Sequence, residues 1–320
     1  MTDLIDRIHE ADVAIRPHVM VSPLERSALL STELGCEVWL KADHLQPTGS
    51  FKLRGATNKV RLVANDFDEV ITASTGNHGR AVAHAAKAFG IKAIVYVSKG
   101  TQPMKMAAIR DAGAELVTID GSVLDAELAA RAESERRGIP YVAGYNDLAT
   151  VAGQGTLGVE LVRQAPDLDA VFVCVGCGGL AGGLGTALKA LSPATRVVGV
   201  SAAASTCMID SLRVGEIIET PESDTLADGS TGAIEPGSVT FPICQEVIDE
   251  TLTVSEREIA QAMRKVAEGN CWMIEGSAGV AVAGLIKTAE RYRGKKVAVI
   301  LCGRNVALDT FLGAIDLGRA

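Results

Sequence analysis

The sequence is poor in aromatic residues, has no excess of basic charge and contains no long apolar run. Phe, Trp and Tyr make up 4% of its 320 residues, whereas hydrophobic residues reach 48% and 33 residues are glycine. The formal net charge of −8 argues against nucleic acid as a partner. No apolar stretch approaches the ~18 residues of a membrane span, and no basic-then-apolar segment opens the chain. We therefore expect neither a membrane span nor a signal peptide.

The cysteines match neither a disulfide framework nor a zinc site. Their number, 7, is odd, and most lie in apolar contexts. Without an export signal, this usage favours reduced thiols and a cytoplasmic location. Cys174 and Cys177 have Cys-x-x-Cys spacing, but no second pair and no nearby histidine completes a metal site. A redox pair is an alternative, although the surrounding glycines favour a ligand-binding loop.

Strand-like and helix-like segments alternate along the chain with short connections, which predicts an α/β protein with mostly parallel sheets and right-handed crossovers. Residues 216–238, rich in Pro, Gly, Asp, Ser and Thr, predict a long loop over a site. The predicted strands are 37–42, 70–73, 93–97, 115–119, 171–175, 196–200 and 296–301. The predicted helices are 5–14, 27–34, 56–63, 80–89, 105–112, 123–137, 155–163, one reaching Leu191, 256–268 and 278–291.

One lysine stands between a predicted strand and a predicted helix. Lys52 lies in the run Pro47–Ala56 (PTGSFKLRGA), near the start of the helix. The positive end of a helix dipole lowers the pKa of an amine, which makes a lysine a better nucleophile toward aldehydes. The alternative from spacing alone is a solvated surface lysine.

Three further polar or glycine-rich segments follow predicted strands. Residues 74–79 (STGNHG) and 176–183 (GCGGLAGG) each precede a helix, where backbone N–H groups can bind a carboxylate or a phosphate. A helix N-cap is the alternative for the first segment, and a packing turn or a dinucleotide-binding loop for the second. Val200 and Ser201 stand where a dinucleotide site would have an acidic residue. The third segment, Cys302–Asn305, ends the last strand.

These motifs, in order from Ser22 to Asn305, resemble those of the fold-type II pyridoxal-phosphate (PLP) enzymes, the family of threonine and serine dehydratases and serine racemase. The resemblance implies a fold like that of the tryptophan synthase β-subunit, with two domains of open, twisted parallel sheets flanked by helices. It implies a large PLP-binding domain at residues 1–68 and 147–320 and a small domain at 69–146. It also implies a homodimer.

The same resemblance assigns roles to individual residues. Lys52 is the Schiff-base lysine and general base, and Phe51 lies against the cofactor's pyridine ring. Asn77 contacts the 3′ oxygen, and the thiol of Cys302 faces the pyridine nitrogen. The expected phosphate ligands are Gly176, Cys177, Gly178, Gly179 and Leu180. The expected substrate-carboxylate ligands are Ser74, Thr75, Gly76, Asn77 and His78.

Some positions depart from the family pattern or match it weakly. Cys177 replaces a usual glycine, which restricts the backbone there, and Arg304 replaces a more common glycine. Residues 227–229 and 275–279 match loops beside the substrate and the cofactor ring. Some members bind a divalent ion through acidic residues at the segment equivalent to 201–207, which has no carboxylate here. We therefore expect no metal.

Thr75 bears on the reaction. Family members usually have Ser or Ala there, and a serine serves as the second acid/base of a racemase. The extra methyl group of Thr75 disfavours racemisation, and a neutral thiol at Cys302 suits β-elimination.

We therefore predict a PLP-dependent ammonia-lyase that removes water from a small β-hydroxy amino acid, such as threonine or serine, to give a 2-oxo acid and ammonia. One alternative is an amino-acid racemase. Another is a dehydratase of hydroxyectoine utilisation, which the sequence Thr75–Arg80 (TGNHGR) resembles. A nucleotide-binding regulatory module is the alternative from a different class.

Overall fold

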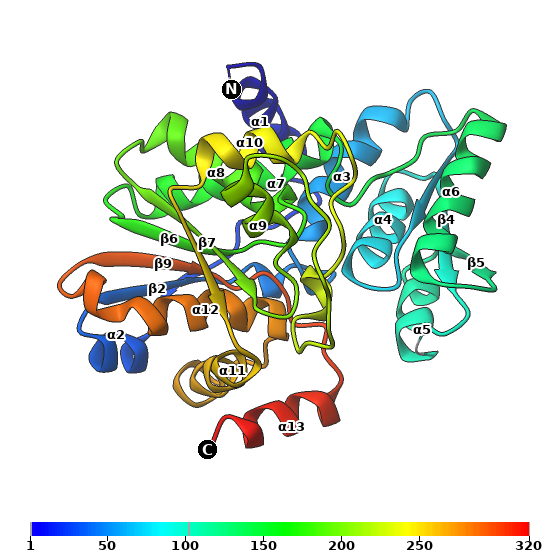
Figure 1. Cartoon of the computed structure of the whole chain (residues 1–320). Coiled ribbons are helices and arrows are strands. Elements are labelled where there is room, and N and C mark those ends of the chain that lie inside the picture. The colour runs from blue at the N-terminus through cyan, green and yellow to red at the C-terminus, as the bar shows by residue number, and fades with distance from the viewer. Residues whose placement is uncertain (1, 102, 320) are drawn as a thin grey trace.

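The computed structural model describes residues 2–101 and 103–319, and its strands form two separate sheets (Figure 1). The strands are β1 (Leu24–Arg26), β2 (Glu37–Lys41), β3 (Glu69–Ala73), β4 (Lys92–Ser98), β5 (Glu115–Ile119), β6 (Ala170–Cys174), β7 (Arg196–Ala202), β8 (Glu250–Val254) and β9 (Lys296–Ile300). The larger sheet has the order β1-β2-β9-β6-β7-β8, in which only the β1–β2 pair is antiparallel. The smaller sheet, β3-β4-β5, is entirely parallel.

Helices connect the parallel strands and cover both sheets. The α-helices are α1 (Thr2–Ala14), α2 (Ala28–Leu34), α3 (Lys52–Val63), α4 (Asn77–Ala88), α5 (Pro103–Asp111), α6 (Val123–Arg137), α7 (Leu148–Gln164), α8 (Gly179–Leu191), α9 (Cys207–Val214), α10 (Thr240–Val247), α11 (Glu256–Asn270), α12 (Gly276–Thr288) and α13 (Leu308–Leu317). The 3₁₀ helices are η1 (Asp43–Leu45), η2 (Asp228–Ser230) and η3 (Ala289–Tyr292). Among the described residues, no helix is long and apolar enough to cross a bilayer.

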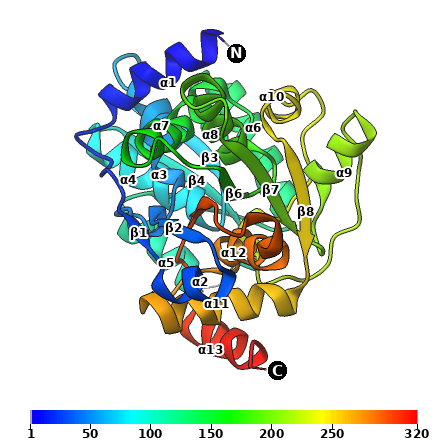
Figure 2. The same ribbon diagram turned by 90° about the vertical axis from the view of Figure 1, so that its left-hand side faces the viewer.

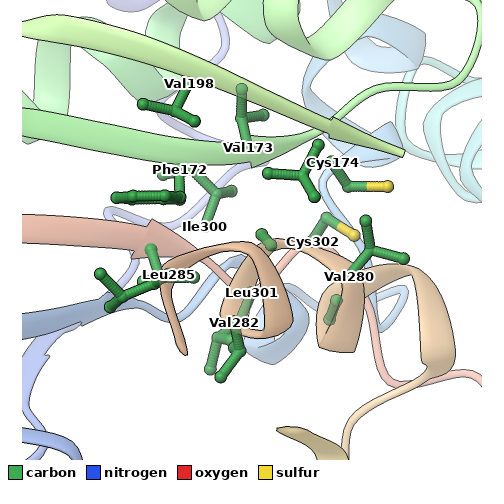
Figure 3. Close-up of a cluster of buried hydrophobic side chains, with 14 of the residues drawn as sticks. Phe172, Val173, Cys174, Val198, Val280, Val282, Leu285, Ile300, Leu301 and Cys302 are labelled. Atoms are coloured by element: carbon green, nitrogen blue, oxygen red, sulfur yellow. The ribbon is translucent and has the colours of Figure 1, made fainter. Parts of the chain in front are cut away.

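The larger sheet lies between two layers of helices. Helices α7, α8 and α10 lie on one side, while α2, α11 and α12 lie on the other, with α13 outside α11 (Figures 1 and 2). Figure 3 shows the apolar side chains between the sheet and α12: Phe172 of β6 lies on the side of Val280 and Leu285, whereas Val173 points to the other face of the sheet. All four are fully buried, and burying such side chains is the main favourable term in folding.

Helix α3 links the two sheets because it packs against both α7 and α4. A buried apolar cluster under the smaller sheet includes Val60 of α3, Val70 of β3 and Val82 of α4. The helix that begins at Lys52 is thus held from both sides, and its first residue lies between the larger and the smaller sheet.

The predicted fold class is confirmed, and several boundaries are wrong. Helix α7 begins at Leu148 and not at residue 155, because the Asp147 side chain accepts a hydrogen bond from the amide of Thr150 (2.9 Å) and caps it. Helix α3 begins at Lys52 and not at residue 56. Helix α12 ends at Thr288, where η3 takes over. The prediction omitted β1, β8, α9, α10 and α13. The division into domains at 1–68 with 147–320, and at 69–146, stays a prediction.

Candidate active site

The turn that carries Lys52 is fixed to the end of β9. The amide of Phe51 donates to the carbonyl of Cys302 (2.9 Å), and the amide of Arg304 donates to the carbonyl of Gly49 (2.9 Å). Gly49 has φ +79, a conformation that other L-residues rarely adopt. Two chain segments that lie far apart in the sequence therefore set the position of the lysine together.

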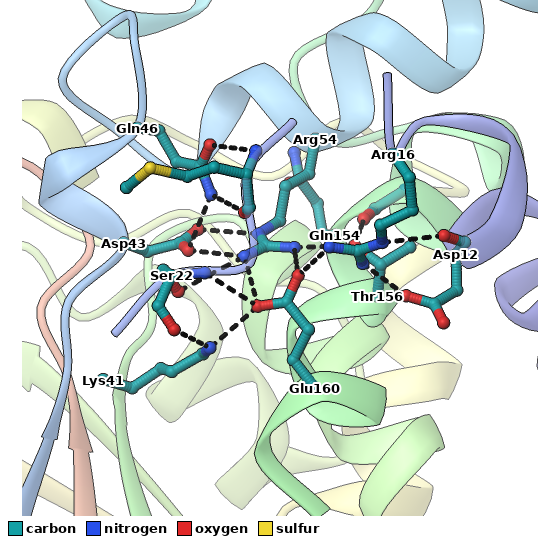
Figure 4. Close-up of polar contacts among 12 residues, drawn as sticks. Asp12, Arg16, Ser22, Lys41, Asp43, Gln46, Arg54, Gln154, Thr156 and Glu160 are labelled. Carbon is teal, nitrogen blue, oxygen red and sulfur yellow. Dashed lines mark hydrogen bonds and ion pairs between the residues drawn. The ribbon is translucent and has the colours of Figure 1, made fainter. Parts of the chain in front are cut away.

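A buried network of charged side chains joins the first turn of α3, which begins at Lys52, to α7 (Figure 4). The guanidinium of Arg54 donates to both carboxylate oxygens of Asp43 (2.6 and 2.8 Å) and to Glu160 of α7 (2.7 Å). Lys41 Nζ also donates to Glu160 (2.7 Å). Burial alone would raise the pKa of Glu160, but Arg54 and Lys41 outweigh burial and lower it to about 2.

This network was not predicted, although the sequence contained a signal for it. Lys41 and Glu160 are charged residues inside apolar segments, EVWLKA and GVELV, and a buried charge requires a partner. Arg54 follows the predicted lysine by two positions and ties the first turn of α3 to α7.

Lys52 itself is partly buried, with its amine in the site. Its Nζ donates to the carbonyl of Gly144 (2.9 Å) and lies 5.3 Å from the centre of the Phe51 ring. Burial lowers the pKa of Lys52, against a smaller opposing effect of Cys177, Cys302 and Glu275. A lowered pKa was predicted from the helix dipole, and the structure adds burial as a cause of the lowered pKa.

Two adjoining cavities meet at Lys52. The first, of about 340 Å³, lies between Phe51, Cys302 and residues 176–181. The second, of about 330 Å³, lies along residues 74–78, with Arg80 and Lys105 in its wall. Both share Lys52, Thr75 and Glu275. Together they bring all the predicted site residues into one site: Phe51, Lys52, Ser74, Thr75, Gly76, Asn77, His78, Gly176, Cys177, Gly178, Gly179, Leu180 and Cys302.

The glycine-rich segment 176–183 presents unpaired amides to the first cavity. Gly178 is the N-cap of α8 with φ +86, and a Cβ there would lie 2.7 Å from the sulfur of Cys244. Within the described part of the chain, the N–H groups of residues 177–180 have no acceptor. Cys177 has no positive φ, so a side chain is tolerated where the family usually has glycine. Unpaired amides at a helix N-terminus are suited to bind an anion.

A second group of unpaired amides lies at the start of α4. Gly76 is its N-cap and supplies no side-chain hydrogen bond, and no acceptor in the described ranges pairs with the amides of residues 77–79. His78 Nε2–H donates to the carbonyl of Val142 (2.9 Å). Burial and the nearby Lys52 lower the pKa of His78 to about 3, so its ring is neutral at pH 7. Backbone amides, and no histidine charge, are therefore available to a carboxylate here.

A chain of side-chain amides lies between the cavities. Asn77 Nδ2 donates to Glu275 (2.9 Å), and Asn305 Nδ2 donates to Asn77 Oδ1 (2.6 Å). The backbone N–H of Asn305 donates to the other carboxylate oxygen of Glu275 (3.0 Å). Burial raises the pKa of Glu275 to about 7, against the opposing effect of these hydrogen bonds. Asn77 Nδ2 also contacts the second oxygen of Glu275 (3.2 Å), so both carboxylate oxygens face Asn77.

The thiol of Cys302 is neutral. Burial raises its pKa well above the ordinary value, and the neighbouring Cys174 and Glu275 act in the same direction. Figure 3 shows Cys174 and Cys302 side by side at the edge of the core next to the site. A neutral thiol can share a hydrogen bond with a ring nitrogen without adding charge to it.

Comparison with known proteins agrees with this geometry. Residues 15–303 match the family described as pyridoxal-phosphate dependent enzyme. The chain belongs to this family. It is 36% identical to L-threonine ammonia-lyase of Geobacter sulfurreducens over 313 residues. The matched region covers 97% of this chain and 78% of the relative. It is 33% identical over 309 residues to L-threo-3-hydroxyaspartate ammonia-lyase of Saccharomyces cerevisiae (96% and 94%).

A solved structure supports the same assignment for this pyridoxal-phosphate enzyme. The processed form of threonine deaminase isoform 2 from Solanum lycopersicum superposes with a TM-score of 0.95 at 32% identity, over 100% of this chain and 94% of that one. The predicted family, fold and cofactor are thus confirmed.

The first cavity fits the cofactor. The partly buried amine of Lys52 is available to the aldehyde, and the unpaired amides of residues 177–180 line the cavity for the phosphate. Phe51 supplies an apolar surface and Cys302 a neutral thiol. The individual roles of these residues stay predictions, and the nucleotide-module alternative receives no support from the family.

Proposed function

We propose that this enzyme is an ammonia-lyase that removes water from a small β-hydroxy amino acid and yields a 2-oxo acid and ammonia. One observation carries the proposal: Lys52 lies at the junction of the two cavities, between amides suited to a phosphate and amides suited to a carboxylate. An amino acid held by its carboxylate at residues 77–79 would present its α-carbon to the lysine. The ammonia-lyase relatives support the same reaction class.

The chain's own residues supply binding and proton transfer. Pyridoxal phosphate, when bound, supplies the electron-withdrawing ring that acidifies the α-proton. Lys52 Nζ, whose pKa burial lowers, takes that proton as the general base. The β-carbon then loses its hydroxyl group, which leaves with a proton as water. The released enamine takes up water and splits into a 2-oxo acid and ammonia, so that no oxidant or reductant is needed.

The finer features of the prediction belong to this proposal as well. We propose a homodimer in the cytoplasm, in line with the family resemblance and the cysteine usage. A β-hydroxy amino acid derived from hydroxyectoine is a candidate substrate, because residues 75–80 resemble that branch.

A substrate panel tests the proposal. The PLP-loaded enzyme is incubated with L- and D-threonine, L- and D-serine, 3-hydroxyaspartate and hydroxyectoine breakdown products, while 2-oxo acid and ammonia are followed together. We expect equimolar release of both from at least one β-hydroxy amino acid. No release from any of them by an enzyme that holds its cofactor would contradict the dehydratase proposal, and chiral analysis of the same samples would then reveal a racemase.

A further inference from the structure

The second cavity contains more positive charge than a substrate such as serine requires. Arg80 of α4 is partly buried in its wall, together with Lys52 and the loop 74–78 that presents the carboxylate-binding amides. Lys105 of α5 adds an ammonium group to the same wall. A substrate held only by its α-carboxylate would use only part of this positive charge.

The two added cations differ in their partners. Lys105 Nζ forms an ion pair with Asp228 across the cavity (2.8 Å). Arg80 instead donates through Nη1 to the neutral side-chain oxygen of Asn305 (2.9 Å). In the described ranges no carboxylate lies within ion-pair distance of Arg80, although most arginines with a partly buried side chain form such pairs here, as Arg16, Arg61 and Arg131 do.

Glu275, the other carboxylate that lines this cavity, forms no ion pair with Arg80 either. Both oxygens of Glu275 accept hydrogen bonds, from Asn77 (2.9 Å) and from the amide of Asn305 (3.0 Å). Its burial also disfavours a full negative charge at neutral pH. The remaining N–H groups of the Arg80 guanidinium are therefore available, and a planar carboxylate is the ligand that they fit best.

Arg80 lies close to the amides that we expect to bind the α-carboxylate of the substrate. Arg80 stands three residues after Asn77 on α4, about 4.5 Å further along the helix axis. The side chain of Asn305 contacts both residues, because it accepts a hydrogen bond from Arg80 Nη1 (2.9 Å) and donates one to Asn77 Oδ1 (2.6 Å). An acid held at residues 77–79 by its α-carboxylate could thus direct its second carboxylate to Arg80.

We propose that Arg80 binds a second acidic group of the substrate and so makes the enzyme prefer a β-hydroxy amino dicarboxylate to threonine or serine. This inference rests on the proposed function, since it names the substrate class for the same site. Arg80 is then a specificity-determining residue, while Lys52 and the amides of residues 77–79 serve every substrate alike.

Arg80→Gln tests the inference because it keeps a hydrogen-bond donor for Asn305 and removes the charge. We expect kcat/KM for 3-hydroxyaspartate to fall roughly 100-fold, mainly through KM, while kcat/KM for serine changes less than about threefold. Arg80→Lys should recover part of the loss. Arg110→Gln, which alters an exposed arginine of α5, is the matched control and should change neither value.

Two kinetic results would overturn the inference. In the first, the wild-type enzyme shows no preference for 3-hydroxyaspartate over serine. In the second, Arg80→Gln lowers activity toward both substrates equally and weakens PLP binding, which would show that Arg80 only positions Asn305 and Asn77.

A binding measurement separates failure of this inference from failure of the proposed function. L-Aspartate has the second carboxylate but no hydroxyl group to eliminate, and L-alanine lacks both. Dissociation constants are measured from the change in cofactor absorbance on titration. We expect the wild type to bind L-aspartate more tightly than L-alanine, and Arg80→Gln to lose that difference. Equal binding of both by the wild type would contradict the role of Arg80 even if no elimination is observed.

Discussion

The Nζ atom of Lys52 lies 2.9 Å from the carbonyl oxygen of Gly144, 92 residues further along the chain. Lys52 begins α3, whereas Gly144 follows residues 140–142, which hydrogen-bond to β3 of the smaller sheet. The amine of Lys52 therefore contacts a segment that is bound to the smaller sheet. The turn that carries Lys52 is instead hydrogen-bonded to the residues that follow β9 of the larger sheet. Any shift between the two sheets changes the surroundings of this amine.

Gly178→Ala tests the anion site at the start of α8. Gly178 has φ +86, and an added Cβ would lie 2.7 Å from the Cys244 sulfur, so the loop has to move. The left-handed conformation alone costs about 1–2 kcal/mol for an L-residue, so we expect the dissociation constant of PLP to rise ~10-fold or more. Gly313→Ala, at a helical position with open space and no positive φ, is the control. Unchanged PLP affinity in Gly178→Ala would contradict the role of this loop.

Thr75→Ala distinguishes elimination from racemisation. Thr75 lines both cavities and is the hydroxyl that a racemase of this family would use on the face opposite the lysine. Elimination relies on Lys52, so we expect its rate to fall less than ~10-fold, whereas a racemase would lose ~100-fold or more with its second acid/base. Ammonia release and chiral analysis measure the two rates in the same sample. A collapse of ammonia release would show that Thr75 is needed for elimination.

Glu275→Gln tests the buried carboxyl between Asn77 and Asn305. Burial raises the pKa of Glu275 from 4.5 to about 7, so the folded protein retains a proton that the unfolded chain loses between these values. Through this group, the free energy of unfolding falls as the pH rises from 4.5 toward 7.

The glutamine variant should lack this contribution. Urea unfolding at pH 5 and pH 8, without substrate, should show a decrease in the wild type that is larger by about 2 kcal/mol than in the variant. Other titrating groups are common to both proteins and cancel in the comparison. The same pH dependence in both would argue against the raised pKa.

Glu160→Gln tests the network behind the lysine turn. The substitution leaves the buried cations Arg54 and Lys41 with a neutral partner, so we expect a loss of about 3–5 kcal/mol in the free energy of unfolding. The pKa of Glu160 is lowered from 4.5 to about 2, so its stabilisation is complete above pH 4.5 and is lost as the pH falls toward 2. Glu290→Gln, which breaks an exposed pair with Arg293, is the control and should leave the unfolding midpoint unchanged. Equal midpoints for the Glu160 and Glu290 variants would contradict a stabilising network.

Local sequence patterns predicted the residues of the site, but they did not predict the long-range contacts that position these residues. Lys52 and the loops 74–79 and 176–183 could be predicted because each follows an apolar strand and combines glycines with polar residues. The hydrogen bond from Lys52 to Gly144 and the ion pair of Arg54 with Glu160 join residues 92 and 106 positions apart, and no local pattern encodes such pairings. Strand β8 was missed because, at the sheet edge, only one of its residues is fully buried.

The central claim is that Lys52 carries the cofactor, and covalent trapping tests it most directly. The PLP-loaded enzyme is reduced with borohydride, which makes the lysine–cofactor linkage permanent, and the labelled peptide is identified by mass spectrometry after digestion. The account predicts that the label is on Lys52 and that Lys52→Ala shows neither the label nor turnover. A label on another lysine, such as Lys105, or full activity in Lys52→Ala would contradict it.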